Sequence, residues 1–220
     1  MKSSVDPAEV EGVALGIVPA QKRGVEARRR LFDAAMAEFA ERGVKGSRVE
    51  NIIAEAGTSW GTFFRYFPRK EDVLLLGAAE HFREHVWPAY ENGVKDPDRT
   101  MRSVAHAVFA ELTEPRYAPR LHAAMIDETV RNPARFAAVL GEGELPIIFL
   151  LSDLIQEGQR RGEVRTELNP FEAAVVIGAG VMFSTTRVLD AVADGLLPPA
   201  EIGAVAQRAF DLIWTGLGDD

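Results

Sequence analysis

The stretch "AGTSWGTFFRYFPRK", residues 56–70, places an indole and a glycine side by side in a segment that otherwise has the composition of a short helix. Ser59, or Thr58 before it, can accept a hydrogen bond from a backbone amide and so cap the start of that helix. Pro68 disrupts a helix that reaches it, so we expect this one to end at about Phe67.

This short helix has two aromatic faces. Phe63 and Phe67 are four residues apart and share one face, so we expect them to pack inward. Their expected neighbours are Phe39 and Ile52. The opposite face carries Trp60, Gly61, Phe64 and Arg65. The spacing therefore predicts a helix that is packed on one side and presents an apolar surface on the other.

Two further helices are predicted before this one. Apolar residues recur at helical spacing over residues 25–42, and Gly43 follows as a stop. Ser47 and Glu50 have the spacing of a capping box, and Gly57 ends the second helix about ten residues after Ser47. Helix, tight turn and helix is the organisation of a helix-turn-helix, in which the second helix enters the major groove of DNA.

The stretch "RRRLFDAAMAEFAERGVKGSRVENIIAEAGTSWGTFFRYFPRKEDVL" resembles the DNA-binding domain of the tetracycline-repressor (TetR) family. The resemblance runs from about Arg28 to Leu74, and the matching residues are Ala35, Phe39, Gly43, Ile52, Ala56, Gly57, Ser59, Gly61, Thr62, Tyr66, Phe67, Lys70, Glu71 and Leu74. It implies an all-α protein with an N-terminal helix-turn-helix domain of three helices. A C-terminal helical domain for ligand binding and dimerisation would follow.

The resemblance also implies DNA-binding roles at the matching positions. Positions that hold phosphate are occupied here by Ser47, Arg48, Ser59, Thr62 and Lys70. Positions in or beside the groove are occupied by Trp60, Gly61, Thr62, Phe64, Arg65 and Tyr66. Gly61 costs about 1 kcal/mol of helix propensity relative to alanine, which suits a backbone that approaches DNA closely. Trp60 could contact a thymine methyl, or it could instead pack under the N-terminal arm or against the first helix.

Charge is distributed unevenly along the chain. The formal net charge is -8, yet residues 21–72 contain 11 Lys or Arg against 8 Asp or Glu, whereas residues 73–220 contain 13 against 22. The basic surplus coincides with the helix-turn-helix. We expect a flexible arm over residues 1–24, a DNA-binding domain over residues 25–72, and a ligand-binding and dimerisation domain over residues 73–220.

The rest of the chain is predicted to be helical. Residues 70–87 keep their apolar positions in phase and should form a lever helix that joins the DNA-binding domain to the body and ends at Pro88. Further helices are expected over residues 98–112, 116–131, 133–140, 145–161, 170–193 and 199–217, several of them starting at or near a proline.

The last two of these helices carry apolar stripes that suit contact with a second copy of the chain. The stripes consist of Ala174, Gly178, Val181 and Thr185 and of Ile202, Val205, Ala209 and Ile213. The resemblance implies a four-helix bundle across a two-fold axis, and packing inside one chain is the alternative. A two-fold axis would present two recognition helices to a palindromic site on double-stranded DNA.

A small-molecule effector is expected among the middle helices. Methionine and aromatic side chains suit an apolar ligand, and the candidates to line its pocket are Phe82, Phe109, Met125, Phe149 and Met182. A plain hydrophobic core is the alternative for each of them. These features together predict a homodimeric, ligand-responsive transcriptional repressor in the cytoplasm, with no enzymatic activity, no cofactor and no membrane partner.

Two other functions remain open. His81, Glu84 and His85 have the H-x-x-E-H spacing of some zinc peptidases, so a metal-dependent hydrolase is one alternative. A DNA-binding protein controlled by a protein partner is the other. The chain has no cysteine, which excludes disulfides, thiolate zinc sites, iron–sulfur clusters and cysteine nucleophiles.

Overall fold

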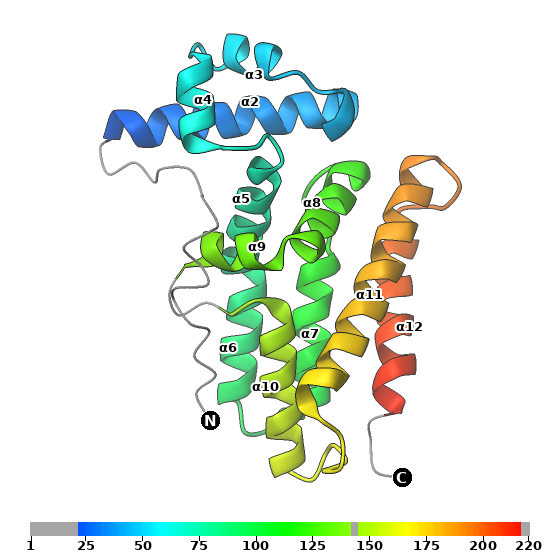
Figure 1. The fold of residues 1–220 in the computed structure, drawn as a ribbon. Helices are drawn as coiled ribbons and strands as arrows, with labels where there is room; N and C mark the ends of the chain where they lie inside the picture. Colours follow the sequence, from blue (N-terminus) through cyan, green and yellow to red (C-terminus); the bar gives the residue numbers. More distant parts are fainter. Residues whose placement is uncertain (1–21, 142–144, 217–220) are drawn as a thin grey trace.

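The computed structural model describes residues 22–141 and 145–216, and every regular element in these two ranges is a helix, as predicted. The elements are α2 (Lys22–Gly46), α3 (Val49–Glu55), α4 (Trp60–Tyr66), α5 (Asp72–His81), η1 (Phe82–Val86), α6 (Trp87–Lys95), α7 (Met101–Thr113), α8 (Pro119–Arg131), α9 (Pro133–Leu140), α10 (Ile147–Arg160), α11 (Pro170–Ala193) and α12 (Glu201–Thr215). Figure 1 shows α2, α3 and α4 as a layer above a bundle built from the remaining helices. The expected arm over residues 1–24 lies outside the described residues except for 22–24, which begin α2.

The layer of α2–α4 has its own apolar core. Phe63 and Phe67 are almost fully buried and share this core with Phe39 and Ile52, so the inward face of α4 is confirmed. Gly57, at a φ of +60°, makes the turn between α3 and α4 in a conformation that glycine adopts without steric cost. Ser59 then caps α4 by accepting a hydrogen bond from the amide of Thr62 at 3.3 Å, which confirms the predicted cap.

The start of α3 differs from the prediction. Ser47 does not cap the helix, because its hydroxyl donates to the Val44 carbonyl at 2.6 Å, and Arg48 occupies the cap position without a side-chain bond. A carboxylate from α2 replaces the cap: Glu38 accepts hydrogen bonds from the Arg48 amide at 3.2 Å and from the Asn51 side chain at 2.9 Å. The capping box was therefore the wrong prediction, since the acceptor comes from another helix.

The lever also differs, because it continues through Pro88 instead of ending there. Proline has no N–H to donate to the carbonyl four residues earlier, and its ring crowds that carbonyl. The turn before it widens into the π-helix η1, in which the Trp87 amide bonds to the Phe82 carbonyl five residues back. Because Pro88 sits in the first turn of α6, the helical path from residue 72 to residue 95 is unbroken.

In the body, α11 packs along α8, α10 and α12. Two glycines let these helices approach closely: a Cβ on Gly178 would lie 2.6 Å from the Ile148 side chain of α10, and one on Gly180 would lie 2.5 Å from the Ile213 side chain of α12. Among the described helices, α11 is the one long and apolar enough to cross a membrane by length and composition. Its packing against three neighbours is that of a central helix in a folded domain.

The prediction that one apolar stripe of α11 faces a second copy of the chain is wrong. Ala174, Gly178, Val181 and Thr185 are buried inside this chain. On α12, Ile202 is also buried, while Val205 and Ile213 are partly buried and pack against the same apolar cluster; Ala209 is partly buried as well. The residues chosen from periodicity face the chain's own core, which is the alternative that the sequence left open.

Candidate nucleic-acid interface

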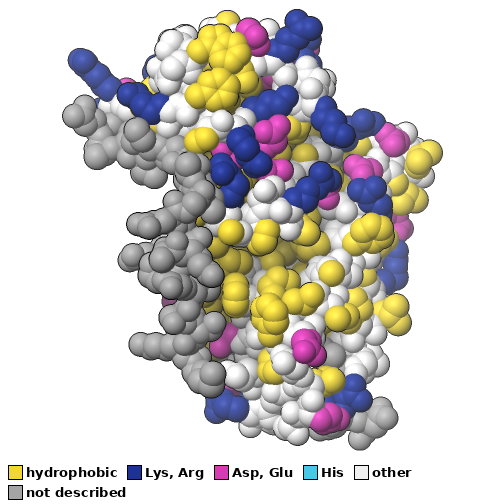
Figure 2. Space-filling view, in the orientation of Figure 1, with side chains coloured by type: hydrophobic (Ala, Val, Ile, Leu, Met, Phe, Trp, Pro, Cys, Tyr) yellow, Lys and Arg dark blue, Asp and Glu magenta, His cyan; other side chains and the backbone are white. Residues whose placement is uncertain are grey.

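The outward face of α4 is an exposed aromatic surface. Trp60 is 45% exposed and Phe64 is 41% exposed, and their rings stack with centroids 5.5 Å apart and planes 20° apart. Phe63 meets Phe64 edge-on from the core side, at 5.2 Å between centroids. Figure 2 shows hydrophobic side chains gathered on the outer surface of the α2–α4 layer, with Lys and Arg side chains close by. Trp60 therefore lies on the surface.

Gly61 lies beside this aromatic surface and leaves the backbone there without a side chain. A Cβ at Gly61 would meet nothing within 4 Å, so internal packing does not require the missing side chain. A glycine inside a helix loses up to about 1 kcal/mol of stability relative to alanine. Packing within the chain does not explain this loss of stability. Close approach of another molecule to the backbone at Gly61 would explain it.

The polar residues at the start of α4 bond to one another. The hydroxyls of Ser59 and Thr62 lie 3.1 Å apart, and Ser59 also accepts the Thr62 amide. Ser59 is exposed and Thr62 is half-buried, so both can still be reached from outside the helix. These two residues stand where the resemblance placed phosphate contacts.

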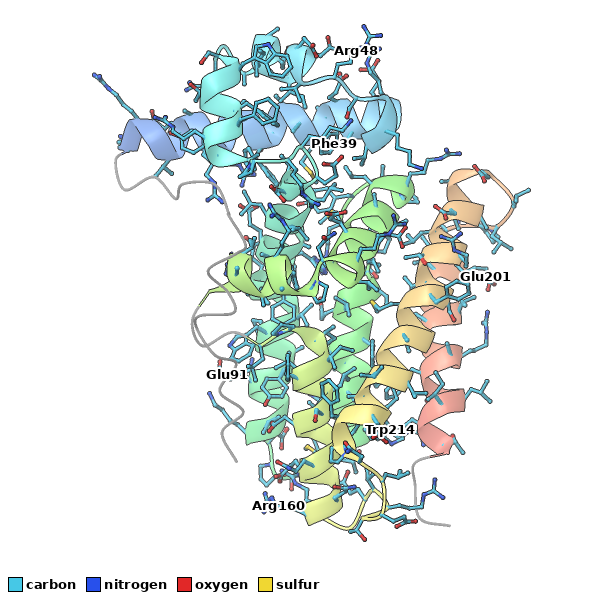
Figure 3. All side chains as sticks on the ribbon, viewed as in Figure 1. Phe39, Arg48, Glu91, Arg160, Glu201 and Trp214 are labelled. Atoms are coloured by element: carbon cyan, nitrogen blue, oxygen red, sulfur yellow. The ribbon has the colours of Figure 1, made fainter. Side chains whose placement is uncertain are left out.

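Two more of the expected phosphate contacts bond to each other. The Lys70 ammonium donates to the Ser47 carbonyl at 3.1 Å and to the Ser47 hydroxyl at 3.3 Å. Ser47 is 6% exposed, and its hydroxyl proton is committed to Val44. Ser47 thus has no proton to offer a phosphate, whereas the ammonium of Lys70 has three donors and keeps one. Arg48 is exposed and projects at the outer edge of the layer in Figure 3.

Arg65 and Tyr66 form a pair at the end of α4. The Arg65 guanidinium donates to the Tyr66 hydroxyl at 2.9 Å and lies over the Tyr66 ring, 4.8 Å from its centroid. Arg65 is exposed, but Tyr66 is only 5% exposed and belongs to the core of the α2–α4 layer. Tyr66 is therefore a core residue that orients Arg65, and its expected contact with DNA stays a prediction.

The arginines that open the first helix are engaged within the chain. The Arg30 guanidinium donates to the Ala56 carbonyl at 3.2 Å, at the end of α3. Arg29 pairs with Asp33 and with Glu80 of α5. Arg28 lies over the ring of Phe67, and burial is the main cause that lowers the pKa of its guanidinium. This cluster joins α2 to α3 and α5.

A largely buried ion-pair network, which no sequence pattern predicted, anchors the turn after α4. Asp72 is 5% exposed and accepts hydrogen bonds from the Arg69 amide at 2.9 Å and from the guanidinium of Arg135 in α9. Arg69 also pairs with Glu128 of α8, which accepts a further bond from Asn132 at 2.9 Å. The partners are about 60 residues apart in sequence, so no local pattern indicated them.

Glu38 is a second buried carboxylate that joins distant parts of the DNA-binding domain and that no sequence pattern predicted. Burial alone would raise the pKa of its carboxyl, but the hydrogen bonds from Asn51 and the Arg48 amide, together with Arg42, outweigh burial and hold the pKa below its usual value. The carboxylate is thus ionised at neutral pH and fixes α3 against α2. The one sequence signal that could have identified it is an acidic residue on the apolar face of an amphipathic helix.

The five residues expected to line an effector pocket are not brought together. Phe109 and Met182 belong to the largest apolar cluster, Phe82 to the cluster between α5 and α9, and Met125 to the core beneath α2–α4. Phe149 is 38% exposed on α10, and its ring lies 6.0 Å from that of Phe171. A surface hollow of about 370 Å³ is lined instead by Arg99, Thr100, Arg102, Ser103, His106 and Ala107.

The histidines of the "HFREH" stretch do not converge on one point with Glu84. His81 is buried, and its Nε2 lies 2.9 Å from the Glu111 carbonyl, to which it must donate because a carbonyl only accepts. Glu84 is 71% exposed and lies 3.8 Å from His85. Within residues 22–141 and 145–216, no group of three His, Asp or Glu side chains is placed to hold a metal ion. The geometry therefore lends no support to the hydrolase alternative.

Comparisons with known proteins find relatives of the helix-turn-helix segment. The family model described as "Bacterial regulatory proteins, tetR family" matches residues 31–76. The HTH-type transcriptional regulator YdgC of Bacillus subtilis is 40% identical over 54 residues, which are 24% of this chain and 28% of YdgC. The alignment thus spans little more than a quarter of YdgC.

Two longer similarities extend beyond that segment. The HTH-type transcriptional repressor AcnR of Corynebacterium glutamicum is 29% identical over 126 residues, 52% of this chain and 67% of AcnR. The crystal structure of FadR from Thermus thermophilus, a TetR-family transcriptional repressor in complex with lauroyl-CoA, matches with a TM-score of 0.65 at 23% identity. That match covers 88% of this chain and 96% of FadR, so the similarity in fold includes the body as well as the helix-turn-helix.

Proposed function

Because this chain belongs to the TetR family of bacterial regulatory proteins, we propose that it is a cytoplasmic, homodimeric transcriptional repressor that a small hydrophobic effector releases from a palindromic operator. The observation that carries the proposal is the exposed Trp60–Phe64 surface on the second helix of a helix-turn-helix. It lies in the basic part of the chain, residues 21–72. We assign DNA reading to residues 25–72, and effector binding and dimerisation to residues 73–220.

In this proposal the residues around α4 divide into two roles. Trp60, Gly61 and Arg65 face the floor of the major groove, where base edges carry the sequence information. Phosphates are held by Arg48, Ser59, Thr62 and Lys70, whose contacts fix the position of the helix without reading sequence. Support comes from the exposure of Arg48 and Ser59 and from the remaining donor of Lys70.

A second copy of the chain is proposed to cover the outer face of α11. That face carries Val175, Val176 and Phe183, which are 42%, 62% and 68% exposed and recur at helical spacing. Leu212 of α12 is 80% exposed. Monomeric proteins seldom leave such a row of large apolar side chains in water. A two-fold axis across this face that points from the body toward the α2–α4 layer would place two copies of α4 on one side of the dimer, where half-sites one helical turn apart could be read.

The proposed effector is an acyl thioester or a related long-chain lipid. FadR from Thermus thermophilus, whose fold this chain shares, binds lauroyl-CoA. The body offers apolar and adaptable side chains at Phe82, Phe109 and Met182, which lie in two neighbouring clusters between α5 and α11. Because these side chains are packed against one another, a ligand has to separate them. Binding would then favour a second arrangement of the helices.

The lever is proposed to carry that change to the DNA-binding domain. Leu74 and Leu76 of α5 pack in the core beneath α2–α4, while Leu75 and Ala79 of the same helix pack in the body. A shift of α5 therefore moves the helix-turn-helix and changes the separation of the two α4 helices in the dimer. The size of this effect is limited by the difference in effector affinity between the two arrangements.

Capture of genomic fragments tests this function. Fragments of the source genome are incubated with the full chain at near-physiological salt, and bound fragments are sequenced. The proposal predicts a small set of fragments that share a palindrome, and release of those fragments by lauroyl-CoA but not by coenzyme A alone. Sequence-independent capture would contradict specific DNA recognition. Specific capture that no acyl thioester releases would leave DNA binding intact and favour control by a protein partner.

A further inference from the structure

We propose that the stacked Trp60–Phe64 pair makes operator recognition depend on the 5-methyl groups of pyrimidines in the major groove. In unmodified DNA these methyl groups belong to thymine. The inference rests on the proposed function, because it concerns how the same helix reads its operator. It assigns a part of the specificity to a pair of rings, beside the hydrogen bonds proposed for Arg65.

The first support is the geometry of the pair. The two rings stack with centroids 5.5 Å apart and nearly parallel planes, and each is more than two-fifths exposed, so together they form one apolar surface. Phe63, which is fully buried, contacts Phe64 edge-on and holds the pair against the core. The surface is therefore supported from beneath and open above, as a rigid docking surface requires.

The second support is the shortage of hydrogen-bonding groups beside the pair. Gly61 has no side chain, and the hydroxyl groups of Ser59 and Thr62 lie 3.1 Å apart and bond to each other. Arg65, near the end of α4, gives one of its five N–H groups to the Tyr66 hydroxyl and keeps the others for contacts of its own. The middle of the outward face is thus apolar. Among the base edges of the major groove, the thymine methyl is the apolar group, because the other edge groups are hydrogen-bond donors or acceptors.

The third support is the charge around the pair, which favours DNA over an apolar protein surface as the occupant. Arg48 and Arg65 are exposed residues of the same α2–α4 layer, and Lys70 keeps a free donor. Residues 21–72 carry a basic surplus, whereas the rest of the chain is acidic. Cationic side chains around an apolar centre match a groove whose walls are phosphates and whose floor exposes methyl groups.

The expected size of the effect follows from the burial of one methyl-sized group. Such burial changes affinity about fourfold, and two half-sites would give about 15-fold for a symmetric operator. A cytosine that carries a 5-methyl group presents the same apolar group at the same place. Cytosine methylation at a contacted position should therefore raise affinity for sites in which cytosine replaces the contacted thymine.

Base-analogue substitution tests the inference. Each thymine of the selected operator is replaced in both half-sites by deoxyuridine, and affinity is measured by fluorescence anisotropy at fixed salt. One or two positions per half-site should lose about 15-fold in affinity, and 5-bromodeoxyuridine, whose bromine is close to a methyl in size, should restore it. Thymines elsewhere in the operator serve as internal controls.

The protein side completes the cycle. Trp60→Ala combined with Phe64→Ala should bind the thymine and deoxyuridine operators with nearly equal affinity, because the surface that detects the methyl is gone. Equal binding of both operators by the unaltered protein would overturn the inference while leaving the proposed function in place. An operator with no thymine opposite α4 would also overturn it, and failure to recover any operator would overturn both.

Discussion

Arg135 of α9 binds the carboxylate of Asp72, the first residue of α5. One terminal nitrogen of its guanidinium donates to Oδ1 at 2.7 Å and to Oδ2 at 2.6 Å, and its Nε donates to Oδ1 at 3.1 Å. Asp72 in turn accepts the Arg69 amide, which fixes the turn between α4 and α5. The contact joins the body to the end of the DNA-binding domain. A change in α9 therefore has a direct route to the turn that positions α4.

Arg135→Gln should lower the free energy of unfolding by about 3 kcal/mol, because among the described residues it leaves Arg69 as the one cationic partner of the buried Asp72 carboxylate. Arg131→Gln on the neighbouring helix is the matched control. Its pair with Asp127 joins two exposed side chains, so its loss should cost less than about 0.5 kcal/mol. Urea unfolding of both variants measures the difference, and equal losses would contradict the assigned role of Arg135.

Phe63→Ala should mainly lower the stability of the chain, whereas Trp60→Ala should mainly change its binding to DNA. Phe63 is fully buried, so its truncation should destabilise the chain by about 3–5 kcal/mol. Trp60 is exposed, so Trp60→Ala should change stability by less than about 1 kcal/mol while weakening operator binding or altering its sequence preference. Thermal unfolding and DNA binding are measured on the same samples. A large stability loss in Trp60→Ala would show that the indole is part of the core.

Stability should fall as pH drops from about 6.5 to about 4, partly because of His122. Burial, followed by the charge of His81, lowers the pKa of His122 to about 4 from its ordinary value of 6.5. Between these values the unfolded chain binds a proton that the folded chain does not, so stability is lost as pH falls. This site contributes at most about 1.4 kcal/mol per pH unit.

His122→Leu should flatten the dependence in that window. A smaller slope should remain because the pKa of His81 is also lowered, mainly by burial. Urea unfolding of both proteins at intervals between pH 4 and pH 8 gives the two slopes. Identical slopes for the variant and the unaltered protein would remove His122 as a cause.

Phe183→Glu should convert the proposed dimer to a monomer, because it places a charge at the most exposed member of the apolar row on α11. Val130→Glu is the control, since Val130 is 60% exposed but lies on a different helix, α8. Light scattering coupled to size-exclusion chromatography reports the mass of each variant. A Phe183→Glu protein that stays dimeric would place the interface elsewhere.

The parts of the fold that depend on neighbouring residues could be predicted from the sequence. The two faces of α4 follow from spacings of four residues, its cap from Ser59, and the turn before it from Gly57. These features are set within one or two helical turns, where periodicity and capping rules apply directly.

The rest depends on contacts between distant residues, which periodicity does not contain. Glu38 replaces the Ser47 cap because α2 brings a carboxylate to the start of α3. Both sides of α11 are apolar, so the pattern could not show that Gly178 and Val181 face α10 and the core while Val176 and Phe183 face outward. Tyr66 is the last residue of α4 and lies at the boundary between its two faces. Arg65, one residue earlier, is exposed, whereas Tyr66 is buried.

Selection from a random pool of DNA duplexes tests the central claim most directly. Full-length protein at near-physiological salt is carried through repeated binding and amplification, in parallel with the Trp60→Ala and Phe64→Ala double variant. We predict that the unaltered protein enriches a palindrome whose half-sites lie about 10 base pairs, or a multiple of that distance, apart. The double variant should lose that preference. An unenriched pool, or the same palindrome from both proteins, would contradict recognition of an operator by the exposed face of α4.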